Sequence, residues 1–163
     1  MSGKFTIIET LNTLKAIFEK HKNERVCVLG TICVGKTTIL GQLAEYNCED
    51  LDDVLWPIIP KEETEYLNEL LAKPWTTECG NEVDRLTYKY AKVKIGYPLF
   101  STVIVDCEAV VYLDISDEIL AKHCEKRRTS FEDSKNIKQA IERDWDNHKS
   151  KGNKTFYYLT ITE

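Results

Sequence analysis

The sequence predicts a three-layer α/β fold, in which a mostly parallel five-stranded sheet carries helices on both faces. Continuous apolar runs at residues 26–29 and 110–114 are typical of parallel strands that are buried on both sides. Segments with apolar residues at every third or fourth position separate such runs and predict amphipathic helices. A loop with two glycines follows the first run. This alternation predicts a single domain over residues 1–163.

The first half of the chain predicts one helix ahead of the sheet and three elements after the first strand. An amphipathic helix is expected at about residues 6–21, where six apolar residues recur at helical spacing: Ile7, Ile8, Leu11, Leu14, Ile17 and Phe18. The strand at Val26–Leu29 is followed by a predicted helix over residues 36–46 and by a short strand that ends near Cys48. A surface helix is predicted for residues 61–72, before Lys73 and Pro74.

The third strand has two possible positions. We favour residues 75–79, followed by a helix over residues 81–94, which places Glu78 at the carboxyl end of the strand, where ligand-binding residues of open α/β sheets lie. The alternative strand covers residues 103–105 and gives that place to Asp106. A parallel crossover needs about a dozen residues, so either the runs at 102–106 and 110–114 are not both strands of the parallel sheet, or one of them is an edge or antiparallel strand.

The last third of the chain has clearer signals. A strand over residues 110–114 is followed by Ser116, a helix-capping residue, and by a helix that continues to Arg127. A polar segment at 128–135 precedes a helix at about 136–148, and the composition of residues 156–161 is typical of a final strand.

Composition restricts the possible partners. The 163 residues carry a formal net charge of −5, which argues against a nucleic-acid-binding surface, and no apolar run approaches the roughly 18 residues of a membrane span. The six cysteines form no Cys-x-x-Cys pair and show no metal-ligand spacing, so we expect reduced thiols and a cytoplasmic protein. Nothing at the N-terminus resembles a signal peptide. The sequence does not predict an oligomeric state.

The loop after the first strand matches the pattern Gly-x-x-x-x-Gly-Lys-Thr, the phosphate-binding P-loop or Walker A motif. Its glycines let backbone N–H groups surround phosphate oxygens at a helix N-terminus. The residues expected to bind nucleotide are Gly30, Thr31, Ile32, Cys33, Val34, Gly35, Lys36, Thr37 and Thr38. We expect Lys36 to reach the β and γ phosphates and Thr37 to offer its hydroxyl to Mg²⁺. The alternative is a chance match to a short pattern, but the predicted strand before the loop and the predicted helix after it favour a true P-loop.

With this motif the chain resembles the small P-loop kinases, a group that includes shikimate, gluconate, adenylate and other nucleoside and nucleotide kinases. The resemblance rests on Gly30 to Thr37, on Asp50-Leu51-Asp52, and on the strand at 110–114 with the helix that ends in Lys126-Arg127-Arg128. It implies a P-loop NTPase fold and a lid-like segment at about 126–136, with Arg127 and Arg128 as lid arginines and Arg143 as a second returning arginine. The chain departs from the family at His123, where an arginine is often found.

Acidic residues and one further arginine complete the expected site. On an extended segment Asp50 and Asp52 would face the same way, one ordering Mg²⁺ together with Thr37 and the other holding or deprotonating an acceptor hydroxyl, while Asp53 would point elsewhere. The alternative is a solvated acidic turn that caps the next helix. Arg85 is placed to contact the acceptor or, equally, to form a surface ion pair. For Arg127 and Arg128 the alternative is a solvated helix end.

The sequence therefore predicts an ATP- and Mg²⁺-dependent kinase that phosphorylates a hydroxyl or phosphate on a small molecule. Nucleoside and nucleotide acceptors are slightly favoured over shikimate-like ones, and the absence of an Asn-Lys-x-Asp signature favours ATP over GTP. The expected partners are thus a nucleotide and a small-molecule acceptor, without nucleic acid or membrane. The alternative function is an NTP-binding regulatory or hydrolytic module that acts through a protein partner. A third possibility is a family member that binds nucleotide without catalysis.

Overall fold

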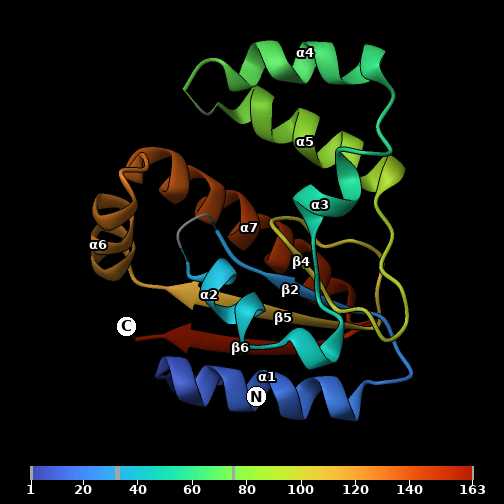
Figure 1. The fold of residues 1–163 in the computed structure, drawn as a ribbon, viewed down its shortest axis with the longest axis vertical. Coiled ribbons are helices and arrows are strands. Elements are labelled where there is room, and N and C mark those ends of the chain that lie inside the picture. The colour runs from blue at the N-terminus through green and yellow to red at the C-terminus, as the bar shows by residue number, and fades with distance from the viewer. Residues whose placement is uncertain (1, 32–33, 75, 163) are drawn as a thin grey trace.

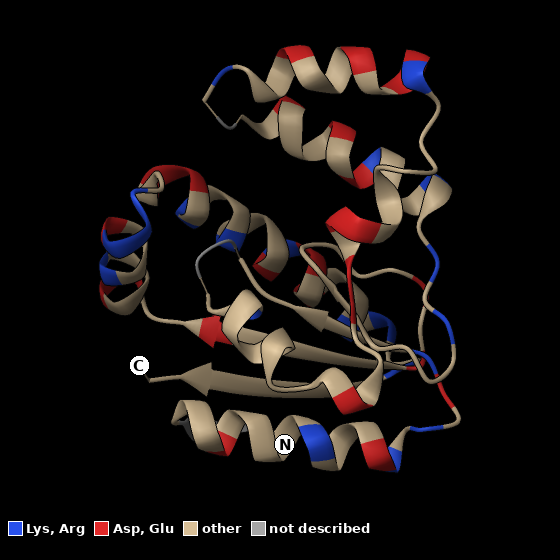
Figure 2. Ribbon diagram, in the orientation of Figure 1, with Lys and Arg blue, Asp and Glu red and all other residues tan. Residues whose placement is uncertain are grey.

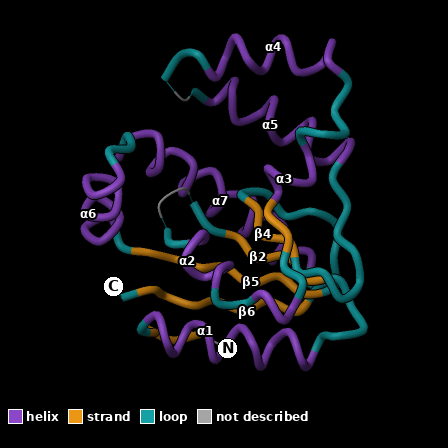
Figure 3. The backbone as a smooth tube through the Cα atoms, in the orientation of Figure 1, coloured by secondary structure: helices purple, strands orange, loops and turns teal. Residues whose placement is uncertain are grey.

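A computed structural model describes residues 2–31, 34–74 and 76–162 of the chain. Its sheet has the strand order β1-β6-β5-β2-β4-β3, and every neighbouring pair is parallel (Figures 1 and 3). The strands are β1 (Ser2–Phe5), β2 (Val26–Leu29), β3 (Glu49–Asp50), β4 (Leu99–Ser101), β5 (Ala109–Ile115) and β6 (Thr155–Ile161). The predicted α/β class with a parallel sheet is confirmed, and β1 adds an edge strand to the five strands expected.

Helices cover both faces of this sheet. One core contains residues of α1 (Ile7–Lys20), α2 (Lys36–Gly41) and α6 (Asp117–Arg127). The other core contains residues of α3 (Leu51–Leu55), α4 (Lys61–Leu71), α5 (Thr77–Tyr90) and α7 (Phe131–Lys151). In Figure 1, α7 runs along the sheet while α4 and α5 project beyond it as a pair. A short 3₁₀ helix, η1 (Ala44–Tyr46), precedes β3.

The central strand β2 explains why two cores form. Its four residues are all buried, and their side chains alternate: Val26 and Val28 belong to the first core, whereas Cys27 and Leu29 belong to the second. Successive side chains of a strand point to opposite faces, so a continuous apolar run can be buried only if both faces are covered. The predicted position of this strand is confirmed at both ends.

Capping residues close in sequence determine where two of the correctly predicted helices begin. Thr6 and Glu9 form a capping box at the start of α1, which confirms the helix expected at about 6–21. Ser116 accepts a hydrogen bond from the backbone N–H of Ile119 and begins α6. The helix at 61–72 and the strands at 110–114 and 156–161 are also confirmed as α4, β5 and β6.

The predicted third strand is wrong. Thr76 caps a helix by accepting a hydrogen bond from the N–H of Cys79, so residues 77–79 begin α5, and Trp75 lies outside the described residues. The alternative at 103–105 is not a strand either, because β4 occupies Leu99–Ser101. The helix expected at 81–94 is α5, which begins and ends earlier. Helix capping by Thr76 thus prevails over the β-propensity of the residues around it.

Residues 102–108 connect β4 to β5 without a helix. They run from the carboxyl end of β4 back to the start of β5, which lies on the other side of β2. Val103, Ile104, Val105 and Cys107 are buried in this connection, and the last three belong to the core that also contains residues of α7. The apolar run that suggested a strand is therefore a buried connecting segment outside the sheet. It can be short because β4 and β5 are not neighbours, since β2 lies between them.

The remaining differences concern element ends. The short strand β3 lies just beyond Cys48, and α2 ends at Gly41 instead of continuing to residue 46. The segment at 128–135 is largely helical, because Ser130 caps α7 by accepting a hydrogen bond from the N–H of Asp133. The lid-like segment at 126–136 is therefore a helix end, a short turn and a helix start. No helix in the described residues is long and apolar enough to cross a membrane.

Candidate functional site

The candidate site lies at the carboxyl ends of the strands, where β2 leads into the loop of residues 30–35, here called the β2–α2 loop. On one side of β2 lies β4 and on the other lies β5, so the strand order reverses at this point. Ligands of open parallel sheets bind at such a reversal. The N–H of Gly30 donates to the carbonyl of Ser101 (3.2 Å), which ties the start of the loop to the end of β4.

Glycine is required at both ends of this loop. A Cβ on Gly30 would lie 2.8 Å from Cγ1 of Val34, which is closer than side chains can pack. Gly35 has a φ of +109°, in the region that disfavours other residues, and α2 begins at the next residue. A side chain is therefore unfavourable at either end of the loop. Ile32 and Cys33, both expected to bind nucleotide, lie outside the described residues.

Thr31 serves as an anchor of the loop. Its side chain is buried, and its hydroxyl donates to the carbonyl of Ser134 in α7 at 2.6 Å. The N–H of Val34 donates to the carbonyl of Thr31 at 3.3 Å. Thr31 and Val34 therefore hold the two parts of the loop together through buried side chains and a backbone hydrogen bond.

Lys36 and two carboxylates meet in one cavity of about 270 Å³, here called the Lys36 cavity. Asp50 and Asp52 line this cavity together with Ser101 and Thr102. Burial lowers the pKa of Lys36, while the charges of Asp50 and Asp52 act in the opposite direction. The cavity thus brings a cation and two potential proton acceptors to the end of the β2–α2 loop.

The two carboxylates share the cavity for a reason other than the one predicted. Asp50 ends β3 and caps α3 by accepting a hydrogen bond from the N–H of Asp52 (3.3 Å), so the residues that follow are helical rather than extended. Asp50 therefore also has the capping role that was the structural alternative. Asp53, expected to point elsewhere, is not among the residues that line the cavity. Figure 2 shows the acidic start of α3 near the end of the sheet.

A second cavity, of about 560 Å³, adjoins the start of α2. It is lined by Gly35, Thr37, Thr38 and Arg127, among others, and we call it the Arg127 cavity. The last turn of α6 thus lies beside the first turn of α2, and the charge of Arg127 contributes to lowering the pKa of Lys36. Arg127 therefore lies close to the start of α2, and its expected role as a lid arginine stays a prediction.

Arg128 does not share that position. It is exposed, has a φ of +55°, and ends α6, with its N–H donating to the carbonyl of Glu125 (3.2 Å). It is not among the residues lining the Lys36 or Arg127 cavities. Its backbone forms the helix end, which corresponds to the structural alternative for this pair of arginines.

Three expected acidic or basic residues lie away from the loop. Glu78 is in the first turn of α5, where it accepts a hydrogen bond from the hydroxyl of Tyr66 in α4. Arg85 pairs with Glu82 at 2.6 Å, which is the surface ion pair that was its alternative. Asp106 is exposed beside Arg25 (3.1 Å). Neither Glu78 nor Asp106 therefore follows the carboxyl end of β4, where Ser101 and Thr102 lie instead.

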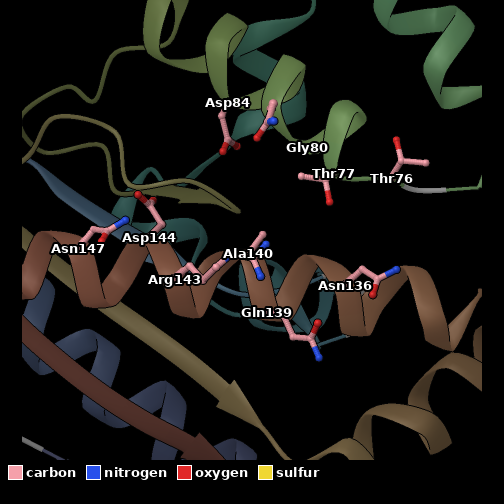
Figure 4. A pocket seen from close by; sticks show the side chains of 11 residues that line it. Thr76, Thr77, Gly80, Asp84, Asn136, Gln139, Ala140, Arg143, Asp144 and Asn147 are labelled. Atoms are coloured by element: carbon pink, nitrogen blue, oxygen red, sulfur yellow. The ribbon is translucent and has the colours of Figure 1, made fainter.

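Arg143 belongs to a third cavity, of about 470 Å³, between α5 and α7. Figure 4 shows Asp84 of α5 and Asp144 of α7 projecting toward the space between the helices. Burial, assisted by the charge of Asp144 and opposed by that of Arg143, raises the pKa of Asp84 to about 6. This polar cavity was not predicted, because no local pattern in the sequence indicates that α5 and α7 face each other.

The donor set suits Mg²⁺ only in part. The described residues contain no group of three or more His, Cys, Asp or Glu side chains that could hold a metal ion. Thr37 lines the Arg127 cavity and Asp50 lines the Lys36 cavity; hydroxyl and carboxylate oxygens are ligands that Mg²⁺ accepts together with water and phosphate. The chemistry of these two side chains suits Mg²⁺, but among the described residues they do not line the same cavity.

Comparison with known proteins does not assign the chain to a group. It matches no protein-family model, and no curated protein is significantly similar to it. The fold defines an α/β protein with a parallel sheet, and the function has to be inferred from the site itself.

Proposed function

We propose that this protein is a Mg²⁺- and ATP-dependent small-molecule kinase of the P-loop type, which transfers the γ-phosphoryl group to an acceptor hydroxyl or phosphate. The observation that carries the proposal is that Lys36, Asp50 and Asp52 line one cavity at the end of a Gly-x-x-x-x-Gly-Lys-Thr loop. The loop supplies a phosphate site, and the carboxylates supply groups that can receive an acceptor's proton.

In the proposed reaction, residues of the Lys36 cavity and of the Arg127 cavity both act on the phosphates. Lys36 would pair with the β and γ phosphates, and Arg127 would neutralise charge from the side of α6. Thr37, with Asp50 acting through water, would hold Mg²⁺, which supplies charge neutralisation on the phosphate oxygens. Asp52 would orient the acceptor hydroxyl and receive its proton. Positioning and charge stabilisation are the main demands of this reaction.

Nucleotide binding tests the first half of the proposal. Thermal unfolding of the wild type should shift upward with Mg²⁺-ATP, since a ligand at about 100 times its Kd stabilises the native state by about 2.7 kcal/mol. Lys36→Met should lose most of this shift. Lys122→Met, on the exposed face of α6, is the matched control and should keep it. An equal shift in all three proteins would show that the loop does not bind the nucleotide.

Acceptor-dependent ADP release tests the second half. Asp52→Asn should retain the Mg²⁺-ATP shift and lose roughly 100-fold or more in turnover, the usual contribution of a general base. The matched control is Asp53→Asn, which alters an adjacent carboxylate outside the cavity. Equal turnover by the Asp52→Asn and Asp53→Asn variants would contradict the role of Asp52.

A second candidate is an NTP-binding hydrolytic or regulatory module that acts through a protein partner. The short turn between α6 and α7 favours it, because a kinase must exclude water and usually does so with a mobile lid. This candidate predicts ADP release that no small acceptor stimulates, and loss of partner binding in Thr37→Ala. Stimulation by a small acceptor would exclude it.

A further inference from the structure

The Lys36 cavity is lined by both charged and apolar side chains. Its charged residues are Lys36, Asp50 and Asp52. Most of the remaining lining, here called the apolar wall, is aliphatic or aromatic and comes from α3, α4 and α5 and the residue after α3, including Leu55, Trp56, Leu67, Leu71 and Val83. A molecule seated here would therefore contact a few charged groups and a larger apolar surface. This lining restricts what the proposed kinase can accept.

The charges disfavour an anionic acceptor. Among the described lining residues Lys36 is the only cation, and the proposed function already pairs it with the phosphates of ATP. Two carboxylates face the same space, and a carboxylate or phosphate placed between them would be repelled and would lose its hydration. An acceptor that already carries a phosphate or an acid group is therefore unfavourable in this cavity.

Neither Arg85 nor Arg143 supplies a second positive charge to the Lys36 cavity. The guanidinium of Arg85 lies 2.6 Å from Glu82 and 3.8 Å from Glu63, on the surface formed by α4 and α5. Arg143 lines the cavity between α5 and α7 together with Asp84 and is not among the residues that line the Lys36 cavity. The anion-binding fork that recognises phosphate or carboxylate is thus absent from the described wall.

The apolar wall favours a flat, uncharged body. Trp56 presents an indole ring, which contacts flat ring systems over a large area. The cavity volume of about 270 Å³ lies just below the roughly 300–1,000 Å³ of typical ligand sites, so the acceptor must be small.

We propose that the Lys36 cavity takes a neutral acceptor with a flat ring and a hydroxyl group, the chemistry of a nucleoside, and excludes phosphate esters and sugar acids. This inference rests on the proposed kinase function and specifies its acceptor. The acceptor oxygen forms a bond to the γ-phosphorus, the bond from that phosphorus to the β,γ-bridging oxygen breaks, and ADP leaves. The hydroxyl proton passes to the carboxylate of Asp52, so the products are ADP and a phosphate monoester.

Matched pairs of acceptors test the charge argument. We would measure ADP formation with Mg²⁺-ATP and each of the common nucleosides, their 5′-monophosphates, shikimate and gluconate. At least one nucleoside should be turned over ten times faster than its monophosphate and than either acid. Faster turnover of a monophosphate or an acid would overturn the inference and leave the kinase proposal standing. Mg²⁺-ATP binding without stimulation by any acceptor would overturn both.

Substitutions on the apolar wall test the location. Trp56→Ala should raise the KM of the preferred nucleoside about tenfold while the KM of Mg²⁺-ATP stays within twofold, and Trp56→Phe should restore most of the affinity. An unchanged nucleoside KM in Trp56→Ala would place the acceptor elsewhere and overturn the inference.

A charge introduced at the rim provides an independent test. Leu71 lines the cavity but is 42% exposed, so Leu71→Arg can be accommodated without burying a cation. This variant should improve the ratio of monophosphate to nucleoside turnover at least tenfold. Ile58→Arg, at a 53% exposed position that does not line the cavity, is the control and should leave the ratio unchanged. An unchanged ratio in Leu71→Arg would contradict the charge argument.

Discussion

Gly30 and Gly35 show how single residues determine the shape of the β2–α2 loop. They are required for different reasons: Gly30 because its neighbour Val34 occupies the space of a side chain, and Gly35 because its φ of +109° is unfavourable for other residues. Both requirements concern the backbone path and not a ligand contact. These two positions therefore constrain where the backbone enters and leaves the loop.

The crowding at Gly30 predicts a measurable loss of stability. Gly30→Ala should lower the free energy of unfolding by about 1–3 kcal/mol, because its Cβ would lie 2.8 Å from a branched side chain in a tight loop. Gly41→Ala is the matched control, since this glycine is helical and a methyl group added there would meet nothing within 4 Å. It should be neutral or stabilising by up to about 1 kcal/mol. Urea unfolding measures both, and equal stabilities would contradict the packing argument.

At the scale of elements, α5 and α7 form an interface that contains ionisable groups. Asp84 and Asp144 project into the same space, and Arg143 offsets only part of the repulsion. Ionising a carboxyl group in such an interface is unfavourable, because the carboxylate is removed from water and lies near a like charge. The pKa of Asp84 is consequently raised from its ordinary 3.8 to about 6.

This raised pKa predicts a pH-dependent effect of Asp84→Asn. A carboxyl whose pKa is higher in the folded than in the unfolded chain favours folding at low pH, and this contribution is lost as the pH rises from 3.8 through about 6. Asp84→Asn should therefore be more stable than the wild type at pH 8, by about 1–3 kcal/mol, since raising a pKa by one corresponds to roughly 1.4 kcal/mol. The gain should vanish near pH 4.

Urea unfolding between pH 4 and pH 8 would measure this difference. Asp53→Asn, at an exposed site in α3, is the control and should show no comparable change across the same range. A stability difference for Asp84→Asn that is the same at pH 4 and pH 8 would mean that Asp84 ionises normally in the folded chain.

At the scale of the whole molecule, the connection from β4 to β5 joins the two halves of the sheet. It passes from one side of β2 to the other, and several of its side chains belong to the core that also contains residues of α7. A helix usually makes such a crossover. Here α7, which is distant in sequence, covers the face that a crossover helix would cover.

Because this connection is part of the core, truncating it should destabilise the entire chain. Ile104 is 1% exposed, and Ile104→Ala should cost about 2–4 kcal/mol in the free energy of unfolding through lost burial and a residual cavity. Ile58→Ala, at a 53% exposed position, should change stability by less than about 0.5 kcal/mol. A small effect at Ile104 would show that the connection behaves as an ordinary surface loop.

The elements that the sequence predicted well are those with local causes. The strand at Val26–Leu29 has a continuous apolar run, α1 has a capping box with regular apolar spacing, and the β2–α2 loop has glycines at the required positions. Each of these signals acts within a few residues of the chain. The placement of Lys36 beside Asp50 and Asp52 was also anticipated, although a helix start, not an extended segment, brings the carboxylates together.

The errors arose where distant contacts decide the structure. Only three residues form β4, and its apolar neighbours at 103–105 look more like a strand than β4 does. Glu78 and Arg85 were expected near the acceptor because residues 75–79 were placed in the sheet, whereas they belong to a helix that pairs with α4. Single-chain patterns do not reveal which helix covers which face.

The sequence alone thus determined the α/β class, the position of the central strand and the places of the two loop glycines, since periodicity, capping and glycine geometry are local properties of the chain. Only the tertiary structure decided which charged residues meet. It placed Arg127 beside α2, left Arg128 at a helix end, and enclosed Lys36 between two carboxylates and an apolar wall. Those juxtapositions depend on the packing of segments far apart in sequence, and it is packing that buries a charge or leaves it in water.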